Sequence, residues 1–201
     1  MSEDLRARIG ANLAGFDRRP SDRPELKAAS VALCVVRADS VPSLLVTRRA
    51  AGLRAHAGQW ALPGGRRDAA ETAEGAALRE LAEETGLALG PEDVLGVLDD
   101  YVTRSGYVMT PVVCWGGPGR DDYAGAETEV QRIHVVPLAD LDVPPRLLQI
   151  PESDAPVIQL PFLGRYLHAP TAAIIFQFCQ VALHGRHTRV AHLEQPVFAW
   201  K

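Results

Sequence analysis

Residues 64–87 read GGRRDAAETAEGAALRELAEETGL, and this stretch carries most of the information about the protein. Two glycines open it, and a run rich in Ala, Leu, Glu and Arg follows. Those residue types favour a helix, which we predict over residues 72–85. Gly86 comes next, where a glycine in the left-handed conformation commonly ends a helix. The stretch therefore predicts a loop, a helix and a second loop.

The predicted helix carries an acidic face near its end. Glu80, Glu83 and Glu84 are spaced i, i+3 and i+4, so their carboxylates lie on one side of the helix. Like charges at this spacing repel each other by about 0.2–0.5 kcal/mol per pair, and the last turn of a helix disfavours anions. Divalent cations would remove both penalties, because Mg²⁺ prefers oxygen ligands. The alternative is an acidic face that is simply solvated.

The charged and glycine positions follow the spacing G-x5-E-x7-R-E-U-x-E-E-x-G-U, in which U is a bulky aliphatic residue. This spacing resembles the Nudix box, and every specified position is filled. The resemblance implies an α+β protein with the Nudix fold, an α/β/α sandwich in which a mixed β-sheet lies between helices. The box itself would form a catalytic loop–helix–loop. The matching residues are Gly65, Glu71, Arg79, Glu80, Leu81, Glu83, Glu84, Gly86 and Leu87.

The resemblance also implies roles for individual residues of the box. The three helix glutamates would be ligands of Mg²⁺ or Mn²⁺, and Gly65 would add a backbone carbonyl. Gly64 and Gly65 allow this close approach because they lack side chains. Glu71 and Arg79 would form an internal ion pair that ties the loop to the helix and takes no part in catalysis.

The implied activity is hydrolysis of a diphosphate linkage in a nucleoside diphosphate derivative, which is a small-molecule substrate. Divalent ions would neutralise the phosphates and lower the pKa of a bound water, and a carboxylate would take its proton. Glu80 is the first candidate for this general base. Glu127 or Glu129, in a polar loop before a predicted strand, is the second, and Glu129 better matches the acidic loop position of the family.

The residues just before the box resemble a narrower group. Residues 44–65 read LLVTRRAAGLRAHAGQWALPGG and are similar to the signature of coenzyme A diphosphatases. Coenzyme A or an acyl-CoA would then be split into 3′,5′-ADP and (acyl-)4′-phosphopantetheine. Arg49 and Arg54 would bind its phosphates, and Gly64 would let the substrate approach the main chain. The matching residues are Thr47, Arg49, Ala50, Arg54, Gly58, Pro63, Gly64 and Gly65, with Leu62 in place of a phenylalanine.

Two other functions are open at this point. Residues 166–175 read YLHAPTAAII, where the coenzyme A group usually has an Ile-Trp-Gly type of segment ahead of its last helix. An ADP-ribose or nucleotide-sugar diphosphatase that shares only the upstream loop is therefore the first alternative. A Nudix-like ligand sensor without hydrolysis is the second, although many such modules lack the metal-binding glutamates that this chain retains.

Outside these segments, the sequence predicts one domain with a short N-terminal appendage. Residues 1–27 are expected to be a helix and a linker arm, and residues 28–201 the Nudix hydrolase domain with a C-terminal helix. Residues 144–170 contain six prolines and give weak local signals. Helices are predicted over residues 2–14 and 171–183, strands over 29–36, 44–47, 94–99, 108–115 and 131–136, and an edge strand within 196–201.

Composition limits the partners that we expect. The 201 residues carry a net charge of −4, and no broad basic field is present, so nucleic-acid binding is not expected. No stretch approaches the ~18 apolar residues of a membrane span, and the N-terminus does not resemble a signal peptide. We therefore expect a cytoplasmic protein without a membrane partner. The helix over residues 171–183 is apolar on most sides, so it is either buried or forms a homodimer interface.

Overall fold

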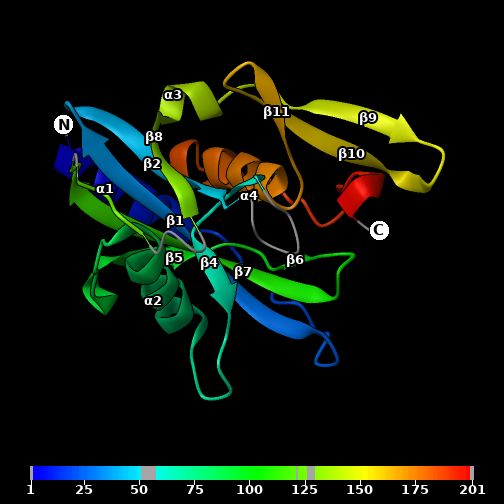
Figure 1. Cartoon of the computed structure of the whole chain (residues 1–201), viewed down its shortest axis with the longest axis horizontal. Helices are drawn as coiled ribbons and strands as arrows, with labels where there is room; N and C mark the ends of the chain where they lie inside the picture. Colours follow the sequence, from blue (N-terminus) through cyan, green and yellow to red (C-terminus); the bar gives the residue numbers. More distant parts are fainter. Residues whose placement is uncertain (1, 51–57, 121, 126–129, 200–201) are drawn as a thin grey trace. The chain divides into compact units, whose positions relative to one another are not determined.

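In the computed structural model, whose helices and strands are labelled in Figure 1, the chain forms two compact units. The second unit contains the glutamate-rich helix, and the first contains the N-terminal and C-terminal segments. The residues described are 2–50, 58–120, 122–125 and 130–199. The first unit comprises Met1–Ala28, Gly96–Thr110 and Ala139–Lys201, and the second comprises Ala29–Leu95 and Pro111–Leu138.

The second unit is built on a β-sheet with the strand order β3-β2-β1-β7, in which β4 also pairs with β1 and β8 with β2. The sheet continues from β7 to β5, and β6 pairs with the first residues of β7. Along the chain, β5 and β7 run from one unit into the other. The strands are β1 (Lys27–Ala38), β2 (Val41–Arg49), β3 (Trp60–Ala61), β4 (Gly64–Arg66), β5 (Val94–Val97), β6 (Tyr101–Val102), β7 (Tyr107–Pro118) and β8 (Val130–Pro137).

The apolar runs of the sequence form the centre of this sheet. Residues 31–36 of β1 are at most 3% exposed, and residues 44–46 of β2 are fully buried. Strands covered on both faces are apolar throughout, which explains the unbroken run. Asp39 and Ser40 join β1 to β2 with φ angles of 47° and 68°, as a two-residue hairpin requires. The strands predicted over residues 29–36 and 44–47 are confirmed.

The helix of the box, α2 (Ala73–Thr85), forms where its sequence predicts it. The Thr72 hydroxyl accepts a hydrogen bond from the backbone N–H of Gly75 at 3.0 Å and so caps the first turn. Gly86, with φ 71°, ends the helix by donating its N–H to the Ala82 carbonyl at 2.9 Å. Leu81 is fully buried, and α2 packs against β4 (Figure 1). The predicted loop–helix–loop is therefore present.

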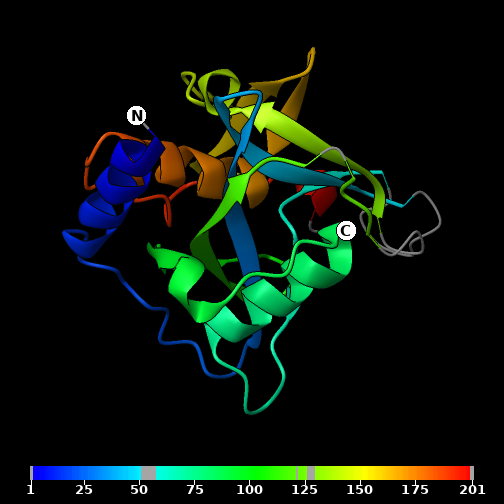
Figure 2. The ribbon, with the colours of Figure 1, turned by 90° about the vertical axis from the view of Figure 1, so that its left-hand side faces the viewer.

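In the first unit, α1 (Ser2–Ala14) packs against the C-terminal helical segment (Figure 2). Its side chains Leu5, Ile9 and Leu13 are at most 9% exposed, and Asn12 donates to the Ala182 carbonyl at 2.9 Å. Residues 2–28 thus group with later segments of the chain, whereas the sequence predicts a helix and linker arm over residues 1–27, ahead of the domain. The apolar face of the helix explains this difference, because it is buried only when a second element covers it.

The weakly predicted residues 144–170 form an antiparallel sheet of three strands, β11-β10-β9. Next along the chain, α4 packs against β10 and β11, and its apolar residues are buried within the chain. The edge strand predicted within residues 196–201 is wrong for the described part, where a 3₁₀ turn forms instead. The bounds are η1 (Pro91–Asp93), α3 (Leu138–Leu141), β9 (Arg146–Ile150), β10 (Ser153–Phe162), β11 (Arg165–His168), α4 (Thr171–Phe178), η2 (Cys179–Leu183) and η3 (Val197–Ala199).

The helix predicted over residues 171–183 changes from α to π geometry at Cys179, within the predicted range. Because α4 is covered by the chain itself, its apolar surface gives no reason for a homodimer. The strand predicted over residues 94–99 ends at Val97, because the carboxylates that follow accept hydrogen bonds from residues 18–21. Among the helices of the described residues, none has the length and apolar character that crossing a membrane requires.

Candidate active site

Arg79 connects the loop before α2 to the acidic face of the helix. Its Nε and Nη2 donate to the two carboxylate oxygens of Glu71 at 2.9 and 3.1 Å, which is a paired contact. Its Nη1 donates to Glu80 at 2.8 Å and to Glu83 at 3.3 Å. Its Nη2 also donates to the backbone carbonyl of Arg66 at 3.2 Å. One guanidinium therefore holds the loop against the helix and brings three carboxylates to a single cation.

The single positive charge of Arg79 faces the three negative charges of its carboxylate partners. The hydrogen bonds from Arg79 lower the pKa of Glu71, and the backbone N–H of Asp68 lowers it further. The same hydrogen bonds raise the pKa of Arg79, which stays charged. The formal charges of one guanidinium and three carboxylates sum to −2. Arg79 by itself therefore does not neutralise the three carboxylates that it contacts.

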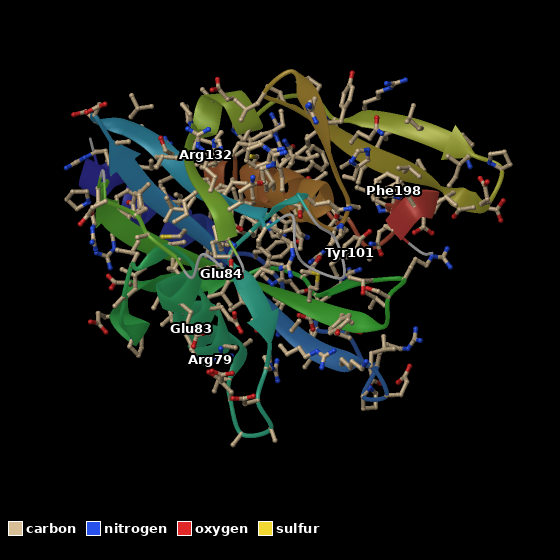
Figure 3. The ribbon with its side chains drawn as sticks, in the orientation of Figure 1. Arg79, Glu83, Glu84, Tyr101, Arg132 and Phe198 are labelled. Atoms are coloured by element: carbon tan, nitrogen blue, oxygen red, sulfur yellow. The ribbon has the colours of Figure 1, made fainter. Side chains whose placement is uncertain are left out.

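The three predicted metal ligands occupy different environments along α2, and Figure 3 labels two of them, Glu83 and Glu84. The Glu83 side chain is 58% exposed and the Glu80 side chain 12%, whereas Glu84 is buried. No three or more His, Cys, Asp or Glu side chains among the described residues gather into a ready metal site. Glu80 and Glu83 nevertheless share one guanidinium nitrogen, so their carboxylates already converge on a positive charge.

The two glycines before the helix meet different neighbours. They pair with β1, with Gly64 opposite Val31 and Gly65 opposite Ser30. A Cβ added at Gly65 would collide with the Glu80 carboxylate, and one at Gly64 would collide with the main chain of β1. The absence of a side chain at Gly65 therefore lets the main chain approach that carboxylate, as the predicted role requires.

A second loop meets the end of α2. The Ala124 N–H donates to the Thr85 carbonyl at 3.2 Å, and a Cβ on Gly125 would collide with the carbonyl of Glu84. The chain is described again from Val130, which lies opposite Arg49 in the β2–β8 ladder. The two loop candidates for the general base, Glu127 and Glu129, lie outside the described residues.

Residues 49–59, which contain Arg49 and Arg54 and are called here the arginine-rich loop, are joined at their two ends by backbone hydrogen bonds of Arg49. The Arg49 N–H donates to the Gln59 carbonyl at 2.9 Å, and its carbonyl accepts from Gly58 at 3.2 Å. The Nε atom of Arg49 is buried and has no hydrogen-bond partner among the described residues. Arg54 lies within the loop but outside those residues. A buried guanidinium nitrogen without a partner is unfavourable, and an anionic ligand would satisfy it.

Sequence analysis missed a group of side chains on three neighbouring strands. His134 and Arg132 of β8 lie on the same face as Arg48 of β2 and Trp60 of β3. The Trp60 and His134 rings are 4.5 Å apart, centroid to centroid. Nothing local in residues 131–136 marks this group, because it depends on the register of strands that are far apart in sequence.

A family model described as the NUDIX domain matches residues 26–160, about two thirds of the chain. The chain belongs to the NUDIX family. Enzymes of this family act on phosphorus-containing anhydrides and generally use divalent metal cations. The matched region includes the box helix, the arginine-rich loop and the strands that position them.

Two curated relatives are bacterial Nudix hydrolases named NudL and described as uncharacterized. The protein of Escherichia coli O7:K1 is 40% identical over 114 residues, which are 56% of this chain and 58% of the relative. The protein of Cronobacter sakazakii is 42% identical over 115 residues, which are 57% of this chain and 59% of the relative. The alignments thus span a little under three fifths of the curated relatives' length.

Two solved structures have the same fold. The MutT protein from Methanosarcina mazei Go1 has a TM-score of 0.52 at 22% identity, covering 82% of this chain and 96% of that one. A MutT/nudix family protein from Enterococcus faecalis has a TM-score of 0.55 at 15% identity, covering 78% and 62%. The predicted family and the predicted fold class, the α+β Nudix fold with a mixed sheet and helices, are confirmed.

Proposed function

We propose that this chain hydrolyses the diphosphate linkage of a nucleoside diphosphate derivative, with coenzyme A or an acyl-CoA as substrate. The products would be 3′,5′-ADP and (acyl-)4′-phosphopantetheine. The observation that carries hydrolysis is the convergence of Glu71, Glu80 and Glu83 on the single guanidinium of Arg79. Carboxylates gathered in this way offer oxygen ligands of the kind that divalent cations prefer.

The donor set fits a hard divalent cation. Glu80, Glu83 and Glu84 would hold Mg²⁺ or Mn²⁺ together with the carbonyl of Gly65, and all of these donors are oxygen atoms. The lack of a side chain at Gly65 supports this metal site, because a side chain there would displace the Glu80 carboxylate. When bound, the metal would neutralise the diphosphate and lower the pKa of a bound water.

The hydrolytic step needs a base for the attacking water. The water oxygen forms a bond to phosphorus, the bond from that phosphorus to the bridging oxygen breaks, and the bridging oxygen leaves with the electron pair on the other phosphate. A carboxylate takes the proton of the water. Glu80 is the first candidate, and Glu129 is the second. The position of Glu129 in the chain supports it, because Gly125 lies against Glu84 and Val130 lies opposite Arg49.

The arginine-rich loop supports a substrate with several phosphates. Arg49 carries a buried Nε without a partner among the described residues, and its backbone closes the loop that contains Arg54. Arginine binds phosphate oxygens with two parallel hydrogen bonds, so both residues suit a diphosphate or a phosphate monoester. Gly64 would contact the substrate through its main chain only, because β1 fills the space that a side chain would take there.

A substrate panel tests the proposal. The full chain is incubated with Mg²⁺, or with Mn²⁺, and with coenzyme A, acetyl-CoA, ADP-ribose, NADH or diadenosine polyphosphates, and the products are identified by mass. We expect 3′,5′-ADP from both thioester and free coenzyme A, and no turnover in EDTA. Reaction in H₂¹⁸O would show which phosphorus is attacked.

The panel separates the alternatives. If only ADP-ribose or nucleotide sugars are cleaved, the coenzyme A assignment is wrong and the diphosphatase assignment stands. If no diphosphate is cleaved with either metal, but one of these ligands raises the unfolding temperature, the chain is a ligand sensor and the hydrolase proposal is wrong.

A further inference from the structure

Four side chains form a row of positive and aromatic groups across three strands of the second unit. Arg48 of β2 lies directly opposite Trp60 of β3 on one side and opposite Arg132 of β8 on the other. His134 is two residues further along β8, opposite Val46, and therefore points to the same face. We call these four residues the cationic cluster; Arg132 is labelled in Figure 3.

Trp60 holds the cluster together. Its ring lies edge-on to the His134 imidazole, with 4.5 Å between ring centroids. The Arg48 guanidinium lies 5.7 Å from the centre of the same ring, within the range of a cation–π contact. Arg48 also donates from Nε to the Gly58 carbonyl at 3.3 Å. The side chains of Arg48 and His134 are therefore both positioned by Trp60.

The positive charges of the cationic cluster have no acidic partner among the described residues. Arg48 and Arg132 are like charges directly opposite each other on paired strands, which is an unfavourable arrangement. No acidic side chain among the described residues pairs with either one. The Nε2 atom of His134 is buried and has no hydrogen-bond partner among those residues. Burial lowers the pKa of His134, and the charges of Arg132 and Arg48 lower it further.

A compact anion would satisfy all three groups at once. The chain has a net charge of −4, so this local concentration of positive charge does not belong to a broad basic field that would suit a nucleic-acid backbone. Two guanidinium groups and one imidazole nitrogen suit a phosphate monoester, which has three oxygens free to accept hydrogen bonds.

We propose that the cationic cluster binds a phosphate monoester of the substrate, with Arg48, Arg132 and His134 as the binding residues and Trp60 as a positioning residue. The proposal rests on the proposed function. It implies that the cluster distinguishes coenzyme A, which carries a 3′-phosphate, from its 3′-dephospho form.

Binding without metal or turnover provides the first test. We expect 3′,5′-ADP to bind the full chain more tightly than 5′-AMP in isothermal titration calorimetry. In Arg132→Gln this preference should fall about 10- to 100-fold, the loss of one charge-assisted hydrogen bond. Arg120→Gln is the matched control, because Arg120 is an exposed arginine of the same unit that pairs with Asp122. Equal affinities for both nucleotides, or equal effects of the two variants, would overturn the proposal.

The pKa of the His134 imidazole provides the second test, because a ligand would not change it if the cluster had only a structural role. In ¹H–¹⁵N spectra followed over pH, 3′,5′-ADP should raise the pKa of His134, since a bound anion offsets the two neighbouring arginines, while adenosine, which has no phosphate, should not. Trp60→Phe should retain part of the effect, because a smaller ring still covers Arg48. An unchanged His134 titration with 3′,5′-ADP at saturation would contradict the proposal.

Kinetics separate this proposal from the proposed function. If coenzyme A is hydrolysed and Arg132→Gln raises its KM about tenfold while leaving the KM for 3′-dephospho-coenzyme A unchanged, both are supported. If coenzyme A is hydrolysed and Arg132→Gln changes neither KM, the cluster proposal alone is wrong. If coenzyme A is not hydrolysed but 3′,5′-ADP binds through Arg132, the substrate assignment alone is wrong.

Discussion

The two units contain two charged clusters that differ in how completely their hydrogen bonds are satisfied. In the first unit, the buried Asp99 carboxylate accepts from Arg189 at 2.7 and 2.9 Å, from Gln177 at 2.8 Å and from the backbone N–H of Arg19 at 2.8 Å. In the first unit several donors thus share one carboxylate. In the second unit the single guanidinium of Arg79 instead donates to three carboxylates.

The difference separates a structural network from a binding site. A carboxylate whose oxygens are saturated by donors fixes the segments that carry the donors, and Asp99 joins three distant parts of the first unit in this way. A group in which three carboxylates converge on one cation gains less stability from its internal contacts, because the like charges repel each other, and its oxygen atoms suit a divalent cation. Four predictions test this comparison, from the largest expected effect to the smallest.

Glu84→Gln should lower kcat by about 10²- to 10⁴-fold, because the several kcal/mol that a bound metal supplies to charge stabilisation would be lost. The substitution keeps the shape of a buried side chain, so the unfolding midpoint in urea should change little. The control is Glu74→Gln in the first turn of the same helix, which should leave kcat unchanged. Full activity in Glu84→Gln would contradict the assignment of the metal ligands.

Asp99→Asn should destabilise the chain by about 2–3 kcal/mol, because the substitution removes the short ion pair of the half-buried Arg189 and leaves only its 3.9 Å contact with the Asp17 carboxylate. Urea unfolding followed by circular dichroism measures this change. Asp122→Asn removes the partner of an exposed ion pair instead and should leave the midpoint unchanged. Similar midpoints for the two variants would show that the Asp99 network contributes no more to stability than an exposed ion pair.

Gly64→Ala should mainly lower stability, whereas Gly65→Ala should mainly lower activity. A methyl group at Gly64 meets the main chain of β1, which cannot move easily, so Gly64→Ala should cost about 1–3 kcal/mol of stability. A methyl group at Gly65 meets the end of the Glu80 side chain, which can move, so Gly65→Ala should retain stability and lose activity. Unfolding midpoints and kcat are measured for both, and a stable, fully active Gly65→Ala would remove Gly65 from the site.

Glu71→Gln should have a small, pH-dependent effect on stability. Arg79 lowers the pKa of Glu71 in the folded state, so the ion pair stabilises the fold above the unfolded pKa and loses this contribution as pH falls through the folded pKa. The gap in thermal midpoint between wild type and Glu71→Gln should therefore be present at pH 7 and shrink at acidic pH. A gap that grows as the pH falls would contradict this sign.

Local signals were sufficient for the box helix and the buried strands. Thr72 and Gly86 mark the ends of α2 because a cap acts on backbone groups within a few residues, and the structure has both caps. The apolar run of β1 also predicts a buried strand from local information, because a strand that is covered on both faces is apolar throughout. The spacing of the box residues was also enough to identify the family.

The sheet over residues 146–168 was not predictable from local patterns, because its central strand β10 carries two prolines and its strands are stabilised by pairing with each other. The same reason applies to the cationic cluster. Arg48 and Arg132 are 84 positions apart in the sequence, and only the register of β2 against β8 places them opposite each other.

The sequence alone determined the family, the helix that presents the glutamates and the residue types available for chemistry, because these depend on spacing and on local backbone preferences. Only the tertiary structure decided which of those residues share a hydrogen-bond donor, such as Glu80 and Glu83 on Arg79, and which carry a buried nitrogen atom with no hydrogen-bond partner among the described residues, such as Arg49 Nε and His134 Nε2. Such pairings depend on contacts between distant segments, and a single chain does not encode them in any short pattern.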